Sequence, residues 1–240
     1  MQQNLIPVRI LSEVDASTAE YDGKHLKRIA QCDDGNTYAM KRMDEHPMIP
    51  ISEWFGYHLC RRCGVRTPDF EVLLPKSGTP SFGSRIATYR QIEADPGSFR
   101  VNSFFTGHQA ALSAIYTLDA VITNPDRHGR NLFIRNDTAG ATVLAFDFSM
   151  AWLVAGQPFG NQELLRGSHT QVWWKTFLRM GCKVDESTLS LLKALDTDWI
   201  ASVLNSAPNE WLRGVDRQAV LDWWETRSEQ RINWAKLWLT

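Results

Sequence analysis

The sequence predicts an α+β fold in which a small antiparallel β-sheet with one helix precedes a mainly helical half. Short apolar runs separated by turn residues dominate roughly the first third of the chain, which is typical of strands. In the remainder, apolar residues at helical spacing over residues 108–123 and an amphipathic pattern over residues 216–240 indicate helices. A chain of 240 residues is long enough to bury a substantial core and to form one two-part unit.

The N-terminal part is predicted to contain three strands and a helix. The strands are expected over residues 8–14, 25–31 and 37–43, with a turn at residues 33–36 between the last two. The third strand carries Lys41, and the helix-like segment over residues 51–60 carries Glu53. Taken singly, Lys41 reads as a solvated edge lysine and Glu53 as a helix-surface acid. Neither residue alone indicates a function.

A helix is predicted over residues 108–123, because Leu112, Ile115, Leu118 and Ile122 recur at helical spacing. Proline disfavours helical geometry in the residue before it, so Pro125 should end this helix. Asp126 is therefore expected on a loop.

The segment after this loop has the pattern of a β-hairpin. Apolar runs at residues 132–134 and 142–146 flank the turn-rich residues 136–140. The start of the first strand of an antiparallel pair lies beside the end of the second. Asn131 and Asp147 should therefore be neighbours despite their separation in the sequence.

Asp126, Asn131 and Asp147 together point to phosphoryl transfer. That reaction needs a carboxylate to orient the attacking hydroxyl and oxygen ligands to hold Mg²⁺ on the phosphates. Each residue alone has a plain alternative, as a turn residue, a strand cap or a surface acid. The five-residue interval from Asp126 to Asn131, however, equals that between the catalytic aspartate and the metal-binding asparagine of protein kinases. We expect Asp126 to act on the acceptor, and Asn131 and Asp147 to bind the metal.

The N-terminal lysine and glutamate complete this pattern. A lysine on the third strand can reach nucleotide phosphates when a carboxylate from the next helix holds it. Lys41 and Glu53 are therefore predicted, with Asn131 and Asp147, to bind the nucleotide. His128 lies two residues after Asp126 and could assist proton transfer or neutralise charge on the phosphoryl group. A simple loop hydrogen bond explains His128 equally well.

These residues resemble those of the HipA family of bacterial kinases. The resemblance rests on Lys41, the segment 53–68 ending in Arg-Cys-Gly-Val-Arg-Thr-Pro, residues 124–131, and Asp147. It implies a protein-kinase-like bilobal fold, with residues 1–92 as the N-lobe and residues 93–240 as the C-lobe. It also implies ATP and Mg²⁺ as cofactors and serine/threonine phosphorylation of a protein, with Asp126 as catalytic base.

Other functions share parts of this pattern. The Asp-Arg-His-x-x-Asn motif also occurs in phosphatidylinositol 3- and 4-kinases, so a lipid or small-molecule hydroxyl is an alternative acceptor. A pseudokinase that serves as a protein-binding module is another alternative, because residues 13–24 lack the Gly-x-Gly-x-x-Gly phosphate loop. HipA-like kinases are often toxins paired with a DNA-binding antitoxin, so an antitoxin or another protein partner is expected.

Composition bears on location and partners. The net charge of −1 argues against a direct nucleic-acid partner, which would call for a basic surface. The sequence has no apolar run long enough for membrane insertion, and its first residues lack a secretory pattern. We therefore expect a cytoplasmic protein. The tryptophans of the C-terminal half are expected in its core, and residues 216–240 should form an amphipathic helix on the larger lobe.

Overall fold

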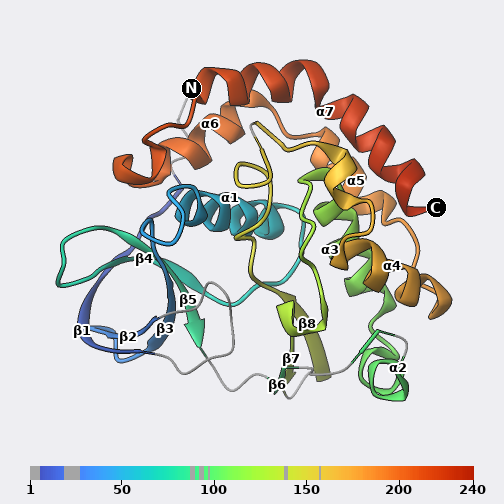
Figure 1. Ribbon diagram of the computed structural model, residues 1–240, viewed down its shortest axis with the longest axis horizontal. Coiled ribbons are helices and arrows are strands. Elements are labelled where there is room, and N and C mark those ends of the chain that lie inside the picture. Colours follow the sequence, from blue (N-terminus) through green and yellow to red (C-terminus); the bar gives the residue numbers. More distant parts are fainter. Residues whose placement is uncertain are drawn as a thin grey trace.

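The structure is a computed structural model in which two lobes meet along a central helix (Figure 1). It describes residues 6–18, 28–86, 90–91, 95–96, 98–137, 140–156 and 158–240. The barrel lobe comprises the strands β1 to β5 and helix α1, and the helical lobe comprises the elements from β6 onward. The predicted α+β bilobal architecture is confirmed.

The barrel lobe is built from five strands that close in the order β1-β2-β3-β5-β4. Their bounds are β1 (Ile10–Thr18), β2 (Arg28–Cys32), β3 (Thr37–Lys41), β4 (Phe70–Leu74) and β5 (Ser81–Ile86). Four of the pairs are antiparallel, and a parallel pairing of β1 with β4 closes the barrel. Alternate residues such as Tyr38 and Met40 fill its interior, as the period of two along a strand requires.

Helix α1 (Ile49–Arg62) lies between the two lobes (Figure 1). Pro50 stands in its first turn, where a missing N–H costs no helical hydrogen bond. The helix is buried except for its last two residues, Arg61 and Arg62, because the barrel packs on one side and the helical lobe on the other. Gly56 allows a particularly close approach, since a Cβ there would lie 2.6 Å from the Phe148 ring.

The helical lobe contains six α-helices and three short 3₁₀ helices among its described residues. They are α2 (Phe99–Phe105), α3 (Gln109–Val121), η1 (Gly129–Asn131), η2 (Gln162–Leu165), α4 (His169–Arg179), α5 (Glu186–Lys193), α6 (Thr197–Ser206), η3 (Asn209–Leu212) and α7 (Arg217–Leu239). The predicted helices 108–123 and 216–240 correspond to α3 and α7. Helix α7 runs along the outer edge of the lobe (Figure 1). No helix among the described residues is long and apolar enough to cross a membrane.

The tryptophans of this lobe contribute to the core, as expected. Those that are buried are Trp152, Trp173, Trp174, Trp211 and Trp224. Those that are partly buried and pack against the core are Trp199, Trp223, Trp234 and Trp238.

A small sheet in the order β6-β7-β8 carries the predicted hairpin. Its strands are β6 (Arg90–Gln91), β7 (Leu132–Asp137) and β8 (Gly140–Ala145). Leu132 pairs with Ala145, and the ladder continues to the pair formed by Asp137 and Gly140. The hairpin therefore places residue 131 beside residue 146.

Two expectations fall largely outside the described residues. The segment 13–24, expected at the phosphate-loop position, is described only as far as residue 18. The expected lobe boundary at residue 92 also lies outside the described part of the chain.

Candidate active site

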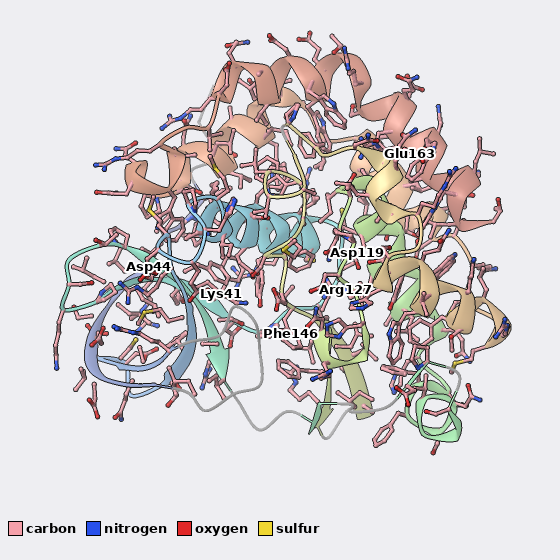
Figure 2. All side chains as sticks on the ribbon, in the orientation of Figure 1. Lys41, Asp44, Asp119, Arg127, Phe146 and Glu163 are labelled. Atoms are coloured by element: carbon pink, nitrogen blue, oxygen red, sulfur yellow. The ribbon has the colours of Figure 1, made fainter. Side chains whose placement is uncertain are left out.

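Three charged side chains from distant parts of the chain meet where the lobes face each other. Lys41 Nζ lies 3.4 Å from Asp147 Oδ2 and 4.0 Å from Glu53 Oε1. Lys41 projects from the end of β3, Glu53 from α1, and Asp147 comes shortly after β8. Figure 2 shows Lys41 beside the barrel and Phe146 at the end of the β7–β8 hairpin. The predicted lysine, glutamate and aspartate therefore form one ionic cluster.

Burial makes this cluster strongly interdependent. Burial alone would lower the pKa of Lys41, but Asp147 and Glu53 outweigh it and raise that pKa. Burial would likewise raise the pKa of Asp147, yet Lys41 and the Ser149 hydrogen bonds hold it well below its usual value. Burial, together with the Asp147 carboxylate, raises the pKa of Glu53 to about 7, against the opposing effect of Lys41. Lys41 is therefore a cation that interacts with two carboxylates, those of Glu53 and Asp147, which repel each other.

Glu53 also anchors the segment that comes after Asp147. Its carboxylate accepts hydrogen bonds from Phe148 N at 2.9 Å and from Ser149 Oγ at 2.7 Å. Ser52 Oγ donates to Phe148 O at 2.7 Å. These bonds support the left-handed backbone of Asp147, whose φ is +61° and which aspartate tolerates better than most residues. Helix α1 thus holds the segment whose Ser149 N donates to Asp147 Oδ1 at 3.2 Å.

The loop between α3 and β7 presents Asp126 and Asn131. Asn131 Nδ2 donates to the backbone carbonyl of Asp126 at 2.8 Å, and Phe146 N donates to Asn131 O at 3.4 Å. Because the amide nitrogen is committed to a carbonyl, the Asn131 Oδ1 atom is available as a metal ligand. The structure therefore brings Asn131 to the end of the hairpin from which Asp147 emerges, as predicted. This donor set of amide and carboxylate oxygens suits Mg²⁺.

A buried ion pair that we did not predict holds this loop in place. Arg127 donates from Nε to Asp119 Oδ2 at 2.7 Å and from Nη2 to Asp119 Oδ1 at 3.1 Å, and both side chains are fully buried. Its Nη1 also donates to the carbonyls of Asn131 and Phe146. One guanidinium therefore joins α3, the loop and the two strands of the hairpin at its open end (Figure 2). The sequence did contain an indication of this ion pair. Residue 119 shares the buried face of its helix with residues 112 and 115, and a buried acid needs a partner.

Helix α4 supplies a second support that no sequence pattern predicted. Thr170 Oγ1 donates to Asn124 O at 2.5 Å and accepts from Arg127 N at 2.9 Å, and Thr170 N donates to Pro125 O at 3.2 Å. The residue before it, His169, places Nδ1 2.9 Å from Asp126 Oδ1. No spacing rule connects these residues with a loop some forty positions earlier, so only the fold reveals them.

His128 lies on the same loop as Asp126, and its ring faces the Asp126 carboxylate. Its Nε2 lies 3.9 Å from Asp126 Oδ1, and its Nδ1 accepts a hydrogen bond from Arg130 N at 3.2 Å. Burial lowers the pKa of His128, with His169 and Arg127 adding to the effect and Asp126 opposing it. A neutral His128 therefore carries its proton on Nε2.

The residues Asp126, His128 and His169 place their candidate ligand atoms within 4.8 Å of one another. This arrangement also occurs in transition-metal sites. A histidine ligand, however, needs a lone pair on the atom that faces the metal. The Arg130 N–H occupies the Nδ1 lone pair of His128, so the proton on Nε2 opposes metal binding there. The cluster is better suited to proton transfer than to metal binding.

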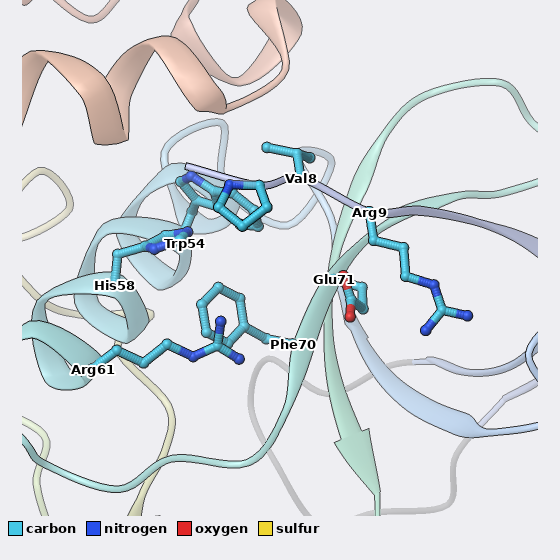
Figure 3. A pocket seen from close by; sticks show the side chains of 8 residues that line it. Val8, Arg9, Trp54, His58, Arg61, Phe70 and Glu71 are labelled. Carbon is cyan, nitrogen blue, oxygen red and sulfur yellow. The ribbon is translucent and has the colours of Figure 1, made fainter. Parts of the chain in front are cut away.

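A separate cavity of about 260 Å³ lies outside this constellation, between α1, β4 and residues 7–9 (Figure 3). Trp54, His58, Arg61 and Phe70 form part of its wall. His58 is buried and its Nε2 has no hydrogen-bond partner among the described residues. Burial, with a contribution from Arg61, lowers the pKa of His58 to about 3, so the ring is neutral. None of the predicted site residues lines this cavity.

Comparison with known proteins bears on the fold. No family model and no curated protein matches the sequence. The structure is similar to that of CtkA, a proinflammatory kinase of Helicobacter pylori, with a TM-score of 0.59 over 97% of this chain and 99% of that chain. The two sequences are 12% identical. The fold is kinase-like.

Two further solved structures overlap less well with this kinase-like fold. HipA of Shewanella oneidensis, solved with HipB and its operator DNA, has a TM-score of 0.41, 10% identity, and coverage of 92% of this chain and 65% of that chain. A Golgi casein kinase with Mn and ADP bound has a TM-score of 0.47, 13% identity, and coverage of 97% and 72%. Both TM-scores lie below 0.5, and the likeness to CtkA concerns the fold alone.

Proposed function

We propose that this protein is an ATP-dependent, HipA-like kinase that transfers the γ-phosphoryl group to a serine or threonine hydroxyl of a protein. The observation that carries the proposal is the meeting of Lys41, Glu53 and Asp147 in one ionic cluster beside the loop that presents Asp126 and Asn131. These residues come from β3, from α1, from the loop between α3 and β7, and from the segment after β8, so both lobes contribute to the site. A kinase needs a lysine held by a glutamate, oxygen ligands for the metal, and a carboxylate near the acceptor, all at one site.

Each residue has a defined role in the proposed reaction. Lys41 binds nucleotide phosphates, and Glu53 keeps it oriented. Asn131 and Asp147 would hold Mg²⁺, which supplies neutralisation of phosphate charge when bound. Asp126 receives or orients the proton of the acceptor hydroxyl. His128, with a proton on Nε2, donates a hydrogen bond toward charge that develops on the transferred group.

The first test is incubation of the protein with γ-labelled ATP, Mg²⁺ and a cell lysate, and then separate analysis of the protein and lipid fractions. We expect label in protein with the wild type, and none with Asp126→Ala or Asp147→Ala. Nucleotide titration should separate the two roles. Asp147→Ala should weaken Mg-nucleotide binding, whereas Asp126→Ala should largely preserve it, because Asp126 acts on the acceptor.

The other outcomes choose among the alternatives. Label only in lipid would favour the phosphatidylinositol-type acceptor that the Asp126–Asn131 motif shares. No transfer and no nucleotide binding would favour a pseudokinase that binds protein partners. The resemblance also leads us to propose an antitoxin as a partner, which co-purification of the tagged protein from its native cells would test. The opposite order of nucleotide affinities in the two variants would refute the role assignments.

A further inference from the structure

Asp126 and His169 form a hydrogen-bonded pair at the candidate active site. His169 Nδ1 lies 2.9 Å from Asp126 Oδ1, within hydrogen-bond distance. An ionised carboxylate can only accept hydrogen bonds, so the proton of a neutral His169 must lie on Nδ1. The lone pair is then on Nε2. An aspartate that orients a histidine in this way leaves the other ring nitrogen as a base.

The position of His169 is fixed by its neighbours, although its own side chain is 65% exposed. Thr170 is fully buried and makes three hydrogen bonds to the loop that carries Asp126. Trp173, one turn along α4, packs against Gly129, where a Cβ would lie 2.5 Å from its ring. The N-terminal turn of α4 and the Asp126 loop therefore form one packed unit.

The two histidines beside Asp126 have opposite hydrogen-bonding character. Their ring centroids are 5.4 Å apart. The Arg130 N–H leaves His128 with a proton on Nε2, so that atom is a donor. The Asp126 carboxylate leaves His169 with a lone pair on Nε2, so that atom is an acceptor. A donor suits the developing charge of the phosphoryl group, and an acceptor suits the departing proton.

We infer that His169 is a catalytic residue that receives the proton of the acceptor hydroxyl on Nε2, while Asp126 orients it and stabilises the resulting imidazolium. This inference deepens the proposed kinase function and rests on it. In the step, the acceptor O–H bond breaks and its proton goes to His169. A bond forms between the acceptor oxygen and the γ-phosphorus. The bond from that phosphorus to the bridging oxygen breaks, and ADP leaves with the electron pair.

The decisive variant is His169→Asn. The asparagine amide nitrogen can replace the Nδ1–H donor to Asp126, but the side chain has no nitrogen that accepts a proton. Transfer from γ-labelled ATP to a degenerate serine/threonine peptide library should fall about 100-fold or more in kcat, within the usual range for general-base catalysis. The Kd for Mg-ATP should not change. Added imidazole should restore part of the rate of His169→Ala.

His108→Asn is the matched control. His108 precedes α3, and its side chain makes no capping hydrogen bond. The 13 residues of α3 separate it from the Asp126 loop, a length of about 20 Å. This control should retain the wild-type rate. The double variant Asp126→Asn/His169→Ala should be no slower than the slower of its two single variants, because the two residues act as one unit.

Each result decides a separate question. Wild-type turnover in His169→Asn, or losses in the double variant that multiply, would overturn the role of His169 while leaving the kinase function intact. If the wild-type protein bound Mg-ATP but transferred no phosphate to peptide, lipid or water, the proposed function and the role of His169 would both be wrong.

Discussion

At the scale of the residue, Lys41 is more informative than its sequence position suggests. A lysine at the end of an exposed strand is ordinarily a solvated charge, yet Lys41 is only 7% exposed and lies between two carboxylates. A buried charge without a partner is strongly destabilising. Lys41 therefore serves the stability of the site as well as its proposed chemistry.

The pKa of Glu53 predicts how stability depends on pH. It is raised from an ordinary value of 4.5 to about 7. Between these values the folded protein keeps a proton that the unfolded chain has released, so this group makes stability fall as the pH rises from 4.5 to 7. Lys41 opposes the shift. In Lys41→Ala the window should therefore extend above pH 7. The variant should lose more stability between about pH 7 and 8 than the wild type, in which Glu53 has already released part of its proton at pH 7.

Urea unfolding at about pH 7 and pH 8 measures this effect. The slope is bounded by about 1.4 kcal/mol for each pH unit and each proton. The control is Lys41→Ala/Glu53→Gln, which has no carboxyl group at position 53 and should lose the added pH dependence. Equal pH slopes for Lys41→Ala and the wild type would show that Glu53 does not depend on Lys41 for its charge.

At the scale of the element, the site is assembled by packing between segments far apart in the sequence. The loop that carries Asp126 touches α4 through Gly129 and Trp173, with no space between them for a side chain at position 129. Glycine has no Cβ, so only this residue allows so close an approach. The contact lets α4 set the position of the loop backbone.

Gly129→Ala should consequently displace the loop from α4. A Cβ would lie 2.5 Å from the Trp173 ring, closer than van der Waals contact permits. We expect transfer to fall at least about tenfold, since small misplacements at an active site carry large rate penalties. Mg-ATP affinity should fall too, but by less, because Asn131 lies in η1 with Gly129 whereas Lys41 and Asp147 lie on other elements. Single-turnover transfer and nucleotide titration check the two expectations.

A second substitution tests whether the clash with the Trp173 ring, and not a general loss of folding, lowers phosphate transfer. Trp173→Leu in the Gly129→Ala background removes the ring that the new methyl group meets. Transfer should recover in part if the clash is responsible. A double variant slower than Gly129→Ala would mean that Trp173 supports the loop in some other way, and the proposed clash would not explain the loss.

The sequence predicted the parts of the site that local rules govern. Helix periodicity, Pro125 and hairpin geometry placed Asp126, Asn131 and Asp147, because each rule acts over a few residues. The Lys41–Glu53 pair was predicted from element order and resemblance. The supports around them were not predicted. Arg127 reaches Asp119 only once the helix and loop have folded together, and no local pattern relates His169 to Asp126.

The strand pairing of the barrel also could not be predicted from local sequence patterns. Alternation and turns predicted strands near β1, β2 and β3, although their ends differ by several residues. The parallel pairing of β1 with β4 joins residues about sixty positions apart. Such non-local pairing depends on the whole barrel, and the sequence of either strand contains no rule for it.

At the scale of the whole molecule, two hydrogen bonds and an aromatic contact join the helical lobe to the barrel lobe and α1. Trp211 Nε1, in η3, donates to Pro80 O at 2.8 Å in the connection between β4 and β5. Trp54 Nε1, in α1, donates to Ser206 Oγ at 3.0 Å at the end of α6. The Trp54 and Trp211 rings also meet edge to face, with centroids 6.0 Å apart. Helix α1, and with it Glu53, is therefore held by both lobes.

This linkage predicts that the lobes unfold together. Wild-type protein should show one transition in urea, with coincident midpoints by tryptophan fluorescence and far-ultraviolet circular dichroism. Trp211→Phe removes the donor to Pro80 O and leaves that carbonyl without its partner, at a cost of about 1–3 kcal/mol. We expect the two midpoints to separate in this variant, because the barrel lobe loses a tie to the helical lobe.

The control for this prediction is Trp238→Phe, near the end of α7, where a partly buried ring stacks on Trp234 within one lobe. That variant should lose some stability but keep coincident midpoints, since no contact between the lobes is removed. Separate transitions in the wild type would mean that the lobes are independent folding units.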